Sequence, residues 1–150
     1  MDYHIAECKI EEIVAGSNKD SKFLQKVVDY LYENFERYSW VGIYIVKGND
    51  LILGPWRGEY ATEHTKIPIG KGICGSAAQS GKTELIPDVN KDSRYLACFV
   101  SMRSEIVVPI KKNKKIVGEI DIDSDIFNAF SKQDAFFLEK IADMLSKHIC

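Results

Sequence analysis

The sequence predicts an α+β fold with a central antiparallel sheet. Two observations predict it: apolar residues recur at helical spacing near both ends of the chain, and the middle consists of short β-rich runs joined by turn residues. With 150 residues the chain is long enough for one core, so we expect a single domain over residues 1–150. We expect the terminal helices on one face of the sheet and a loop-covered ligand pocket on the other.

Three helices are expected near the ends of the chain. The first covers about residues 5–15, and the second covers about residues 20–37. The last follows Ser131, which forms a capping box with Asp134. The apolar positions expected to face the core are Phe23, Val27, Val28, Leu31 and Phe35 in the second helix, and Phe136, Phe137, Ile141, Met144, Leu145 and Ile149 in the last.

Two hairpins are expected in the middle of the chain. The run "SWVGIYIVKGNDLILGPWRG" contains two β-rich segments around "KGND", and "SEIVVPIKKNKKIVGEIDID" contains two more around "KKNKK". Between them, "KIPIGKGICGSAAQSGK" is rich in small residues and predicts a short, closely packed helix that opens near Gly72.

Composition excludes several classes of protein. A net charge of −2 argues against a broad nucleic-acid surface, and no apolar run is long enough for a membrane span. The first residues, "MDYHIAECKI", lack the basic-then-apolar order of a secretory signal, so we expect a cytoplasmic protein. In a reducing compartment the four cysteines need a reason other than structural disulfides.

The cysteines Cys8, Cys74, Cys98 and Cys150 form no C-x-x-C pair, so we expect neither a metal nor another cofactor. Cys98 lies in the loop "RYLACFVSMR", where it is reactive only if a cation such as Arg94 or Arg103 stabilises its thiolate. Cys74 falls in the first turn of the predicted short helix, a place that favours a thiolate. The alternative for Cys74 is an inert, buried structural cysteine.

Strand alternation predicts an acidic face in the second hairpin. In "GEIDID" the side chains of Glu119, Asp121 and Asp123 point to one side. A solvated face is one interpretation. The other is that a cation lies nearby, because three like charges on one strand face repel one another.

The first hairpin carries an aromatic face. Trp40, Gly42 and Tyr44 point to the same side, so two aromatic rings flank a glycine. This arrangement predicts a box floored by bare backbone and suited to a small ligand with an apolar end. The alternative is a contact with the core or with a second copy of the chain.

The motifs "WVGIY", "LILGPWRG", "IPIGKGICG", "DVN", "LAC", "SEIVVPI" and "GEIDIDS" resemble, in this order, those of the free methionine-(R)-sulfoxide reductases, a family with the GAF fold. The resemblance runs from about Ser39 to Phe130. It implies that Cys98 attacks the sulfur of free methionine sulfoxide and becomes a sulfenic acid. It also implies that Cys74 resolves this acid as a disulfide, which a thioredoxin-like reductant then reduces.

The resemblance also implies the roles of the acidic and aromatic residues. Glu105, Asp121 and Asp123 would bind the ammonium group and the sulfoxide, while Trp40 and Tyr44 would enclose the methyl-sulfur end. A carboxylic acid would protonate the sulfoxide oxygen; Glu105 and Asp123 are the candidates, and the sequence does not decide between them.

One departure from the family pattern places the chain in a two-cysteine branch. Many members carry a further cysteine just before the "IP" run, where this chain has "EHTK" at residues 63–66. Whether Cys8 or Cys150 joins the recycling stays open, and a homodimer is expected by analogy only. The other hypotheses are a GAF sensor for a small ligand such as a cyclic nucleotide, for whose output domain 150 residues leave no room, and a purely structural domain.

Overall fold

The computed structural model describes residues 1–17, 22–96 and 101–149. The chain begins with two helices, continues through two β-segments separated by a third helix, and ends with a fourth. The elements are α1 (Tyr3–Ala15), α2 (Lys22–Asn34), β1 (Trp40–Lys47), β2 (Asp50–Gly58), β3 (Lys66–Pro68), α3 (Gly72–Ser80), β4 (Glu84–Ile86), a short 3-10 helix (Val89–Lys91), β5 (Ser104–Lys112), β6 (Lys115–Ser124) and α4 (Lys132–Ser146).

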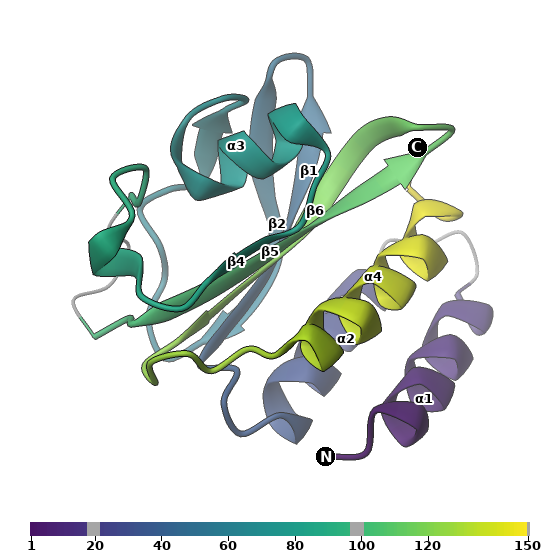
Figure 1. Cartoon of the computed structure of the whole chain (residues 1–150). Coiled ribbons are helices and arrows are strands. Elements are labelled where there is room, and N and C mark those ends of the chain that lie inside the picture. The colour runs from purple at the N-terminus through teal and green to yellow at the C-terminus, as the bar shows by residue number, and fades with distance from the viewer. Residues whose placement is uncertain (18–21, 97–100, 150) are drawn as a thin grey trace.

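The strands form one six-stranded antiparallel sheet in the order β3-β2-β1-β6-β5-β4. Helices α1, α2 and α4 lie on one face of this sheet, and α3 lies on the other (Figure 1). The α+β prediction and both predicted hairpins are therefore confirmed, as is the short helix that opens at Gly72. The loops and α3 cover the face on which the sequence predicts a pocket.

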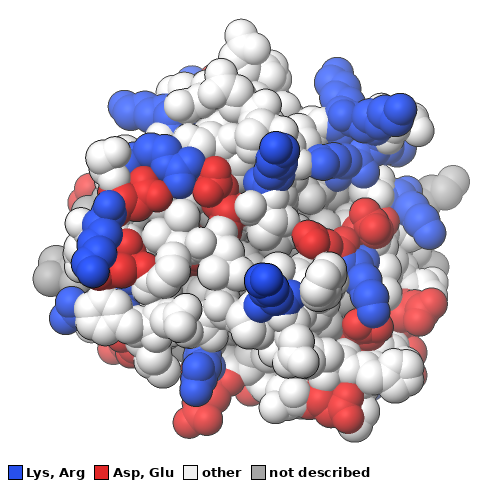
Figure 2. Space-filling model, viewed as in Figure 1, with Lys and Arg blue, Asp and Glu red and all other residues white. Residues whose placement is uncertain are grey.

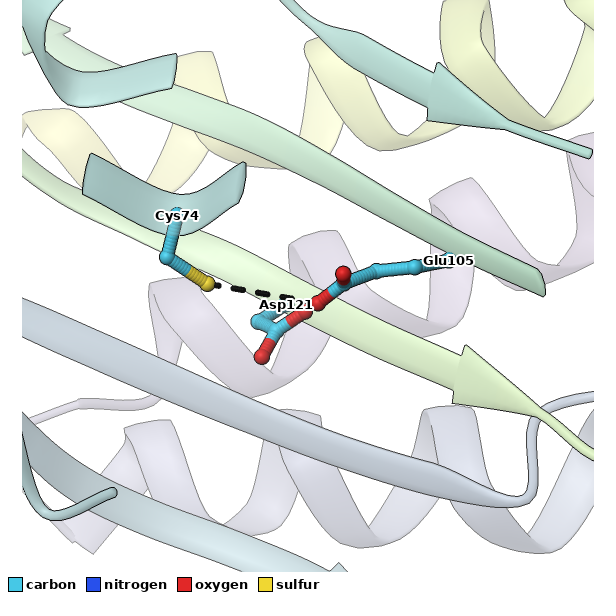
Figure 3. Close-up of side chains that lie close together, drawn as sticks. All are labelled: Cys74, Glu105 and Asp121. Atoms are coloured by element: carbon cyan, nitrogen blue, oxygen red, sulfur yellow. Dashed lines mark hydrogen bonds between the residues drawn. The ribbon is translucent and has the colours of Figure 1, made fainter. Parts of the chain in front are cut away.

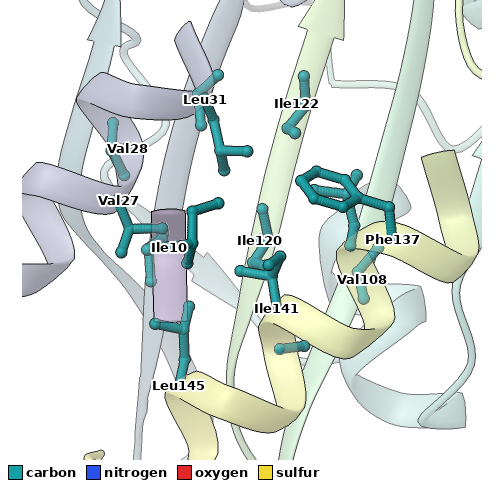
Figure 4. Close-up of a cluster of buried hydrophobic side chains, with 14 of the residues drawn as sticks. Ile10, Val27, Val28, Leu31, Val108, Ile120, Ile122, Phe137, Ile141 and Leu145 are labelled. Carbon is teal, nitrogen blue, oxygen red and sulfur yellow. The ribbon is translucent and has the colours of Figure 1, made fainter. Parts of the chain in front are cut away.

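The main core lies between the sheet and the three helices α1, α2 and α4. Alternate residues of the central strands point toward these helices, among them Ile120 and Ile122 of β6. They meet side chains such as Leu31 of α2 and Leu145 of α4 (Figure 4). A smaller apolar cluster lies on the opposite face, beneath α3. The two clusters leave the central strands covered on both sides.

The start of α4 is fixed by the predicted capping box. Ser131 Oγ accepts from the backbone N–H of Asp134, and the Asp134 carboxylate accepts from the backbone N–H of Ser131. The same carboxylate accepts a buried hydrogen bond of 2.6 Å from the hydroxyl of Tyr38. Because Tyr38 lies just before β1, this contact joins the first turn of α4 to the strand that carries Trp40.

One predicted core position is wrong. Phe136 is 66% exposed, whereas Phe137 is 2% exposed. Successive residues of a helix are rotated by about 100°, and this rotation places Phe136 on the side of α4 opposite the buried stripe. The buried stripe of α4 runs through Phe137, Leu138, Ile141 and Leu145.

Acidic and basic side chains alternate over the face seen in Figure 2, with lysines gathered over the β5–β6 turn. These lysines are exposed and belong to the "KKNKK" run. Within the described residues, the helices are too short or too polar to cross a lipid bilayer.

The pair Phe136 and Phe137 provides a matched test of this packing. Phe137→Ala should lower the free energy of unfolding by about 3–5 kcal/mol, because it leaves a cavity in the main core. Phe136→Ala should change it by no more than about 0.5 kcal/mol, because its ring already meets solvent. Urea unfolding followed by circular dichroism measures both values, and equal losses would contradict the assigned face of α4.

Candidate functional site

The predicted acidic and aromatic faces meet on the side of the sheet covered by α3. In the register of β1 and β6, each aromatic-face residue lies directly opposite one acidic-face residue. The pairs are Trp40 with Asp123, Gly42 with Asp121, and Tyr44 with Glu119. On the far side of β6, Glu105 of β5 is paired with Asp123. Four carboxyl groups and two aromatic rings therefore share one surface.

Cys74 reaches this surface from above. It is the third residue of α3, and its Sγ donates a long hydrogen bond of 4.0 Å to Glu105 Oε2 (Figure 3). Donor atoms of Cys74, Glu105 and Asp121 all lie within 4.8 Å of one another. At Gly75 the helix packs closely against the segment that precedes it, because a Cβ there would lie 2.6 Å from the carbonyl oxygen of Pro68.

The carboxyl groups of the site are removed from water. Glu105, Glu119, Asp121 and Asp123 are each no more than 5% exposed. Burial raises the pKa of Asp121, with partial relief from hydrogen bonding to Glu105 and Cys74. Burial also raises the pKa of Asp123 well above its ordinary value, and the charge of Asp121 adds to this effect. The site thus favours protonated carboxyl groups in the absence of a bound cation.

The thiolate expected at Cys74 is not favoured, which corrects the prediction from the helix N-terminus. Burial raises the pKa of the Cys74 thiol well above its ordinary value, and the charges of Asp121, Glu119, Glu105 and Asp123 raise it further. The partial positive charge of a short helix does not outweigh desolvation together with four neighbouring carboxylates. Cys74 is buried, as the alternative interpretation held, yet its thiol faces polar groups.

The aromatic side differs in one respect from the predicted box. The Trp40 ring lies over the backbone of Gly42 and Gly58, where an added Cβ would come within 2.4 Å of ring atoms at either position. The indole therefore occupies the floor that was expected to be bare. Trp40 also stacks against Trp56, with ring centroids 6.1 Å apart and planes 13° apart.

A small pocket opens between the aromatic and acidic sides, with a volume of about 20 Å³. The residues that line it are Tyr44, His64, Ile67, Ile73, Cys74, Leu96, Glu105 and Asp121. The hydroxyl of Tyr44 donates to the carbonyl oxygen of His64 at 2.7 Å and so holds one wall. This space suits about one water molecule, so a larger ligand requires its walls to move outward.

The predicted nucleophile Cys98 and the C-terminal Cys150 lie outside the described residues, and Cys8 is exposed on α1. Of the two cations proposed for Cys98, Arg94 is held by ion pairs of 2.8 Å with both Glu84 and Asp92. Arg103 lies over the ring of Phe127. The guanidinium of Arg94 is thus committed to two carboxylates.

Cys74, Glu105 and Asp121 are also close enough together to hold a metal ion. The set contains no imidazole and only one thiol, unlike the Cys and His sets of structural zinc sites. Burial also raises the pKa values of Cys74 and Asp121, which favours their protonated forms, and these bind metals poorly. We therefore assign no metal to these residues.

The sequence analysis did not identify three features of this site. They are the positions of Trp56 and Leu96 and the burial of Glu119 within it. Trp56 is the partner of Gly42 in the β1–β2 register, so its stacking on Trp40 follows from the pairing of a hairpin that the sequence did predict. Glu119 was placed on the acidic face without a role. Leu96 gave no signal, because its place in the pocket depends on the path of the loop.

The fold and this buried thiol–carboxylate surface define a GAF domain with a polar pocket. The family model for the GAF domain matches residues 21–149. The chain belongs to the GAF family and, within it, to the group of the free methionine-R-sulfoxide reductases.

Three similar proteins illustrate this relationship. The free methionine-R-sulfoxide reductase of Escherichia coli is 33% identical over 90% of this chain and 81% of its own length. The structure of the Neisseria meningitidis enzyme in complex with its substrate matches 97% of this chain and 87% of its own, with 35% identity and a TM-score of 0.91. A type II enzyme from Thermoplasma acidophilum matches 93% and 94%, with 37% identity and a TM-score of 0.83.

Asp123→Asn should change how stability depends on pH. The folded-state pKa of Asp123 is raised, so above about pH 4 the folded protein binds more protons than the unfolded chain, and stability falls as pH increases toward that folded pKa. Asparagine does not titrate. The variant should therefore gain stability relative to the parent protein as pH rises: the difference in the free energy of unfolding, variant minus parent, should be larger at pH 8 than at pH 5.

Urea unfolding at the two pH values measures this difference, and Asp143→Asn, an exposed site on α4, controls for the substitution itself. A difference between Asp123→Asn and the parent that stays constant with pH would show that burial does not hold a proton on Asp123.

Proposed function

We propose that this protein reduces free methionine (R)-sulfoxide to methionine, with its own thiols as the electron source. One observation carries the proposal: a buried thiol lies 4.0 Å from a buried carboxyl group, beside an aromatic wall. The similarity to free methionine-R-sulfoxide reductases supports it.

Cys98 is the proposed nucleophile. Its sulfur attacks the sulfoxide sulfur, the oxygen is transferred, and the products are methionine and a Cys98 sulfenic acid. The thiol supplies both electrons, so this step requires no cofactor. The assignment rests on the position of Cys98 in the family motif.

Asp123 is the proposed proton donor to the sulfoxide oxygen. It lies directly opposite Trp40 in the sheet, so its carboxyl group adjoins the wall proposed for the methyl-sulfur end. Burial raises its pKa well above the ordinary value, which favours the protonated form that a general acid requires. Glu105 remains the other candidate, because it is the cross-strand partner of Asp123.

Asp121, together with Glu105, is proposed to hold the ammonium group of the free amino acid. A bound cation lowers the pKa of nearby carboxyl groups, so they ionise only when this substrate is present. A peptide-bound methionine sulfoxide has no ammonium there and would leave these buried groups uncompensated. This charge requirement accounts for selectivity toward the free amino acid.

Cys74 is the proposed resolving residue. It attacks the sulfenic acid, forms a Cys74–Cys98 disulfide and releases water, and a thioredoxin-like reductant restores both thiols. Such recycling operates in a reducing compartment such as the cytoplasm. Within this proposal the chain follows the two-cysteine branch, and the homodimer stays a prediction.

The cysteine roles are separable by single-turnover kinetics. The parent protein should consume NADPH with free methionine (R)-sulfoxide in a thioredoxin-coupled assay, whereas Cys98→Ser should be inactive. Cys74→Ser should release about one methionine per protein and then stop, because attack survives and resolution does not. Cys8→Ser controls for the loss of a thiol, and N-acetyl-methionine sulfoxide serves as the control substrate that lacks the ammonium group.

Two results would reject the assignments. Absence of methionine release from the reduced parent protein with several reductants would reject the reductase activity. Repeated turnover by Cys74→Ser with thioredoxin alone would reject Cys74 as the resolving residue.

Substitution of Gly58, which lies beneath the Trp40 ring, tests whether this ring contacts the substrate. In Gly58→Ala the new Cβ would lie 2.4 Å from a ring atom, so the indole must move away from the sheet. We expect KM for methionine sulfoxide to rise about tenfold, or about 1.4 kcal/mol, with a smaller change in kcat. Gly16→Ala is the control, because its Cβ would lie 3.4 Å from the nearest atom, the carbonyl oxygen of Glu12. An unchanged KM would show that the ring does not contact substrate.

A further inference from the structure

His64 lines the small pocket of the site, and the reaction proposed above gives it no role. It lies half-buried in the loop between β2 and β3. Two hydrogen bonds fix its backbone: its N–H donates to Thr62 Oγ1 at 3.0 Å, and its carbonyl oxygen accepts from the hydroxyl of Tyr44 at 2.7 Å. Because the backbone of His64 makes both contacts, they survive a substitution of its side chain.

A free amino acid brings two charges to the site, and the acidic cluster holds only one of them. Asp121 and Glu105, whose ligand atoms lie within 4.8 Å of each other (Figure 3), are proposed to bind the ammonium group. The α-carboxylate is attached to the same carbon atom as that ammonium group. It therefore lies near the same two acidic side chains, which repel it when they are charged. The substrate thus requires a hydrogen-bond donor beside the acidic cluster.

Few of the described side chains that line the pocket can donate to a carboxylate. The hydroxyl of Tyr44 already donates to the carbonyl oxygen of His64, and the thiol of Cys74 donates to Glu105. The other described lining residues, apart from His64, are acidic or apolar. An imidazole ring carries one N–H donor in its neutral form and two in its protonated form. Among the described lining residues, His64 is therefore the one whose side chain is suited to bind an anion.

The basic side chains closest to the pocket in sequence are engaged elsewhere. Lys66, two residues after His64, forms an ion pair of 3.7 Å with Asp50. Arg94 is held by the two carboxylates described above. Neither of these basic residues lines the pocket. A carboxylate inside the pocket thus depends on His64 rather than on a lysine or an arginine.

We propose that the imidazole of His64 binds the α-carboxylate of free methionine sulfoxide. The inference rests on the function proposed above and deepens it. Asp121 and Glu105 bind the ammonium group and His64 binds the carboxylate, so the site recognises both charges of the zwitterion. A methionine sulfoxide at the N-terminus of a peptide keeps the ammonium group but has an amide in place of the carboxylate. His64 therefore selects against a class of substrate that the acidic groups alone would accept.

Binding of the reaction product tests the proposal without turnover. L-Methioninol differs from L-methionine in having a hydroxymethyl group in place of the carboxylate. Titration of the reduced parent protein, followed by tryptophan fluorescence, should give a Kd about 20-fold lower for methionine, as expected for a hydrogen bond to a charged group. In His64→Ala this ratio should fall to about twofold, because only methionine loses a contact. His4→Ala, exposed on α1, is the matched control and should keep the parent ratio.

Steady-state kinetics provide a second measurement. With methionine (R)-sulfoxide, His64→Ala should raise KM about 20-fold with a smaller change in kcat, whereas KM for methioninol sulfoxide should stay within about twofold of the parent value. His64→Gln keeps an N–H donor in its amide group, so its KM for methionine sulfoxide should lie between those of the parent and the alanine variant. A disturbance of the loop alone would instead raise the KM values of both substrates together.

The possible results separate this proposal from the function on which it rests. An equal rise in Kd for methionine and methioninol in His64→Ala overturns the role of His64. A parent protein that binds both ligands equally well also overturns it, and methionine release by that protein would leave the reductase function intact. A parent protein that prefers methionine through His64 but releases no methionine from the sulfoxide supports the carboxylate contact and rejects the reductase function. If both ligands bind too weakly to titrate, the two KM values decide.

Discussion

The burial of four carboxyl groups and one thiol on a single face of the sheet is the constraint on which the site depends. Charged groups in this position would be strongly disfavoured, so the site favours neutral forms until a cation binds. Burying polar groups beneath α3 costs free energy. The apolar side chains buried in the main core, on the other face under α1, α2 and α4, offset this cost. The face of the sheet that carries the main core thus stabilises the face that carries the site.

The two faces are connected through single strands. In β6, Ile120 and Ile122 enter the main core, while the acidic residues between and beside them form the site. β5 follows the same alternation, with Ile106 in the core next to Glu105 in the site. A slip of one residue would exchange the two faces, so the core packing that fixes the register also fixes the site. The packing of the core therefore determines the positions of the carboxyl groups.

Local pattern predicted most of the fold and the composition of the site. Alternation placed Asp121 and Trp40 on the faces they occupy, and the box of Ser131 and Asp134 begins the last helix as expected. The failures concern contacts between distant segments. The thiol state of Cys74 depends on carboxyl groups brought to it by β5 and β6, and helix position alone did not reveal them. Likewise, the floor beneath Trp40 includes Gly58 of the neighbouring strand, which alternation within β1 does not show.

The proton balance of the proposed reaction explains why such a buried site is suitable. A sulfoxide and two thiols give a sulfide, a disulfide and water, so the two thiol protons leave in the water and none is taken from solvent. The protons need only move within the site, from thiols to the oxygen that departs. Burial raises the pKa values of Glu119 and Asp123, which favours carboxyl groups that keep their protons and pass them over short distances. A water-filled site would instead ionise these groups and release their protons to solvent. The exclusion of water by α3 therefore serves the chemistry as well as the packing.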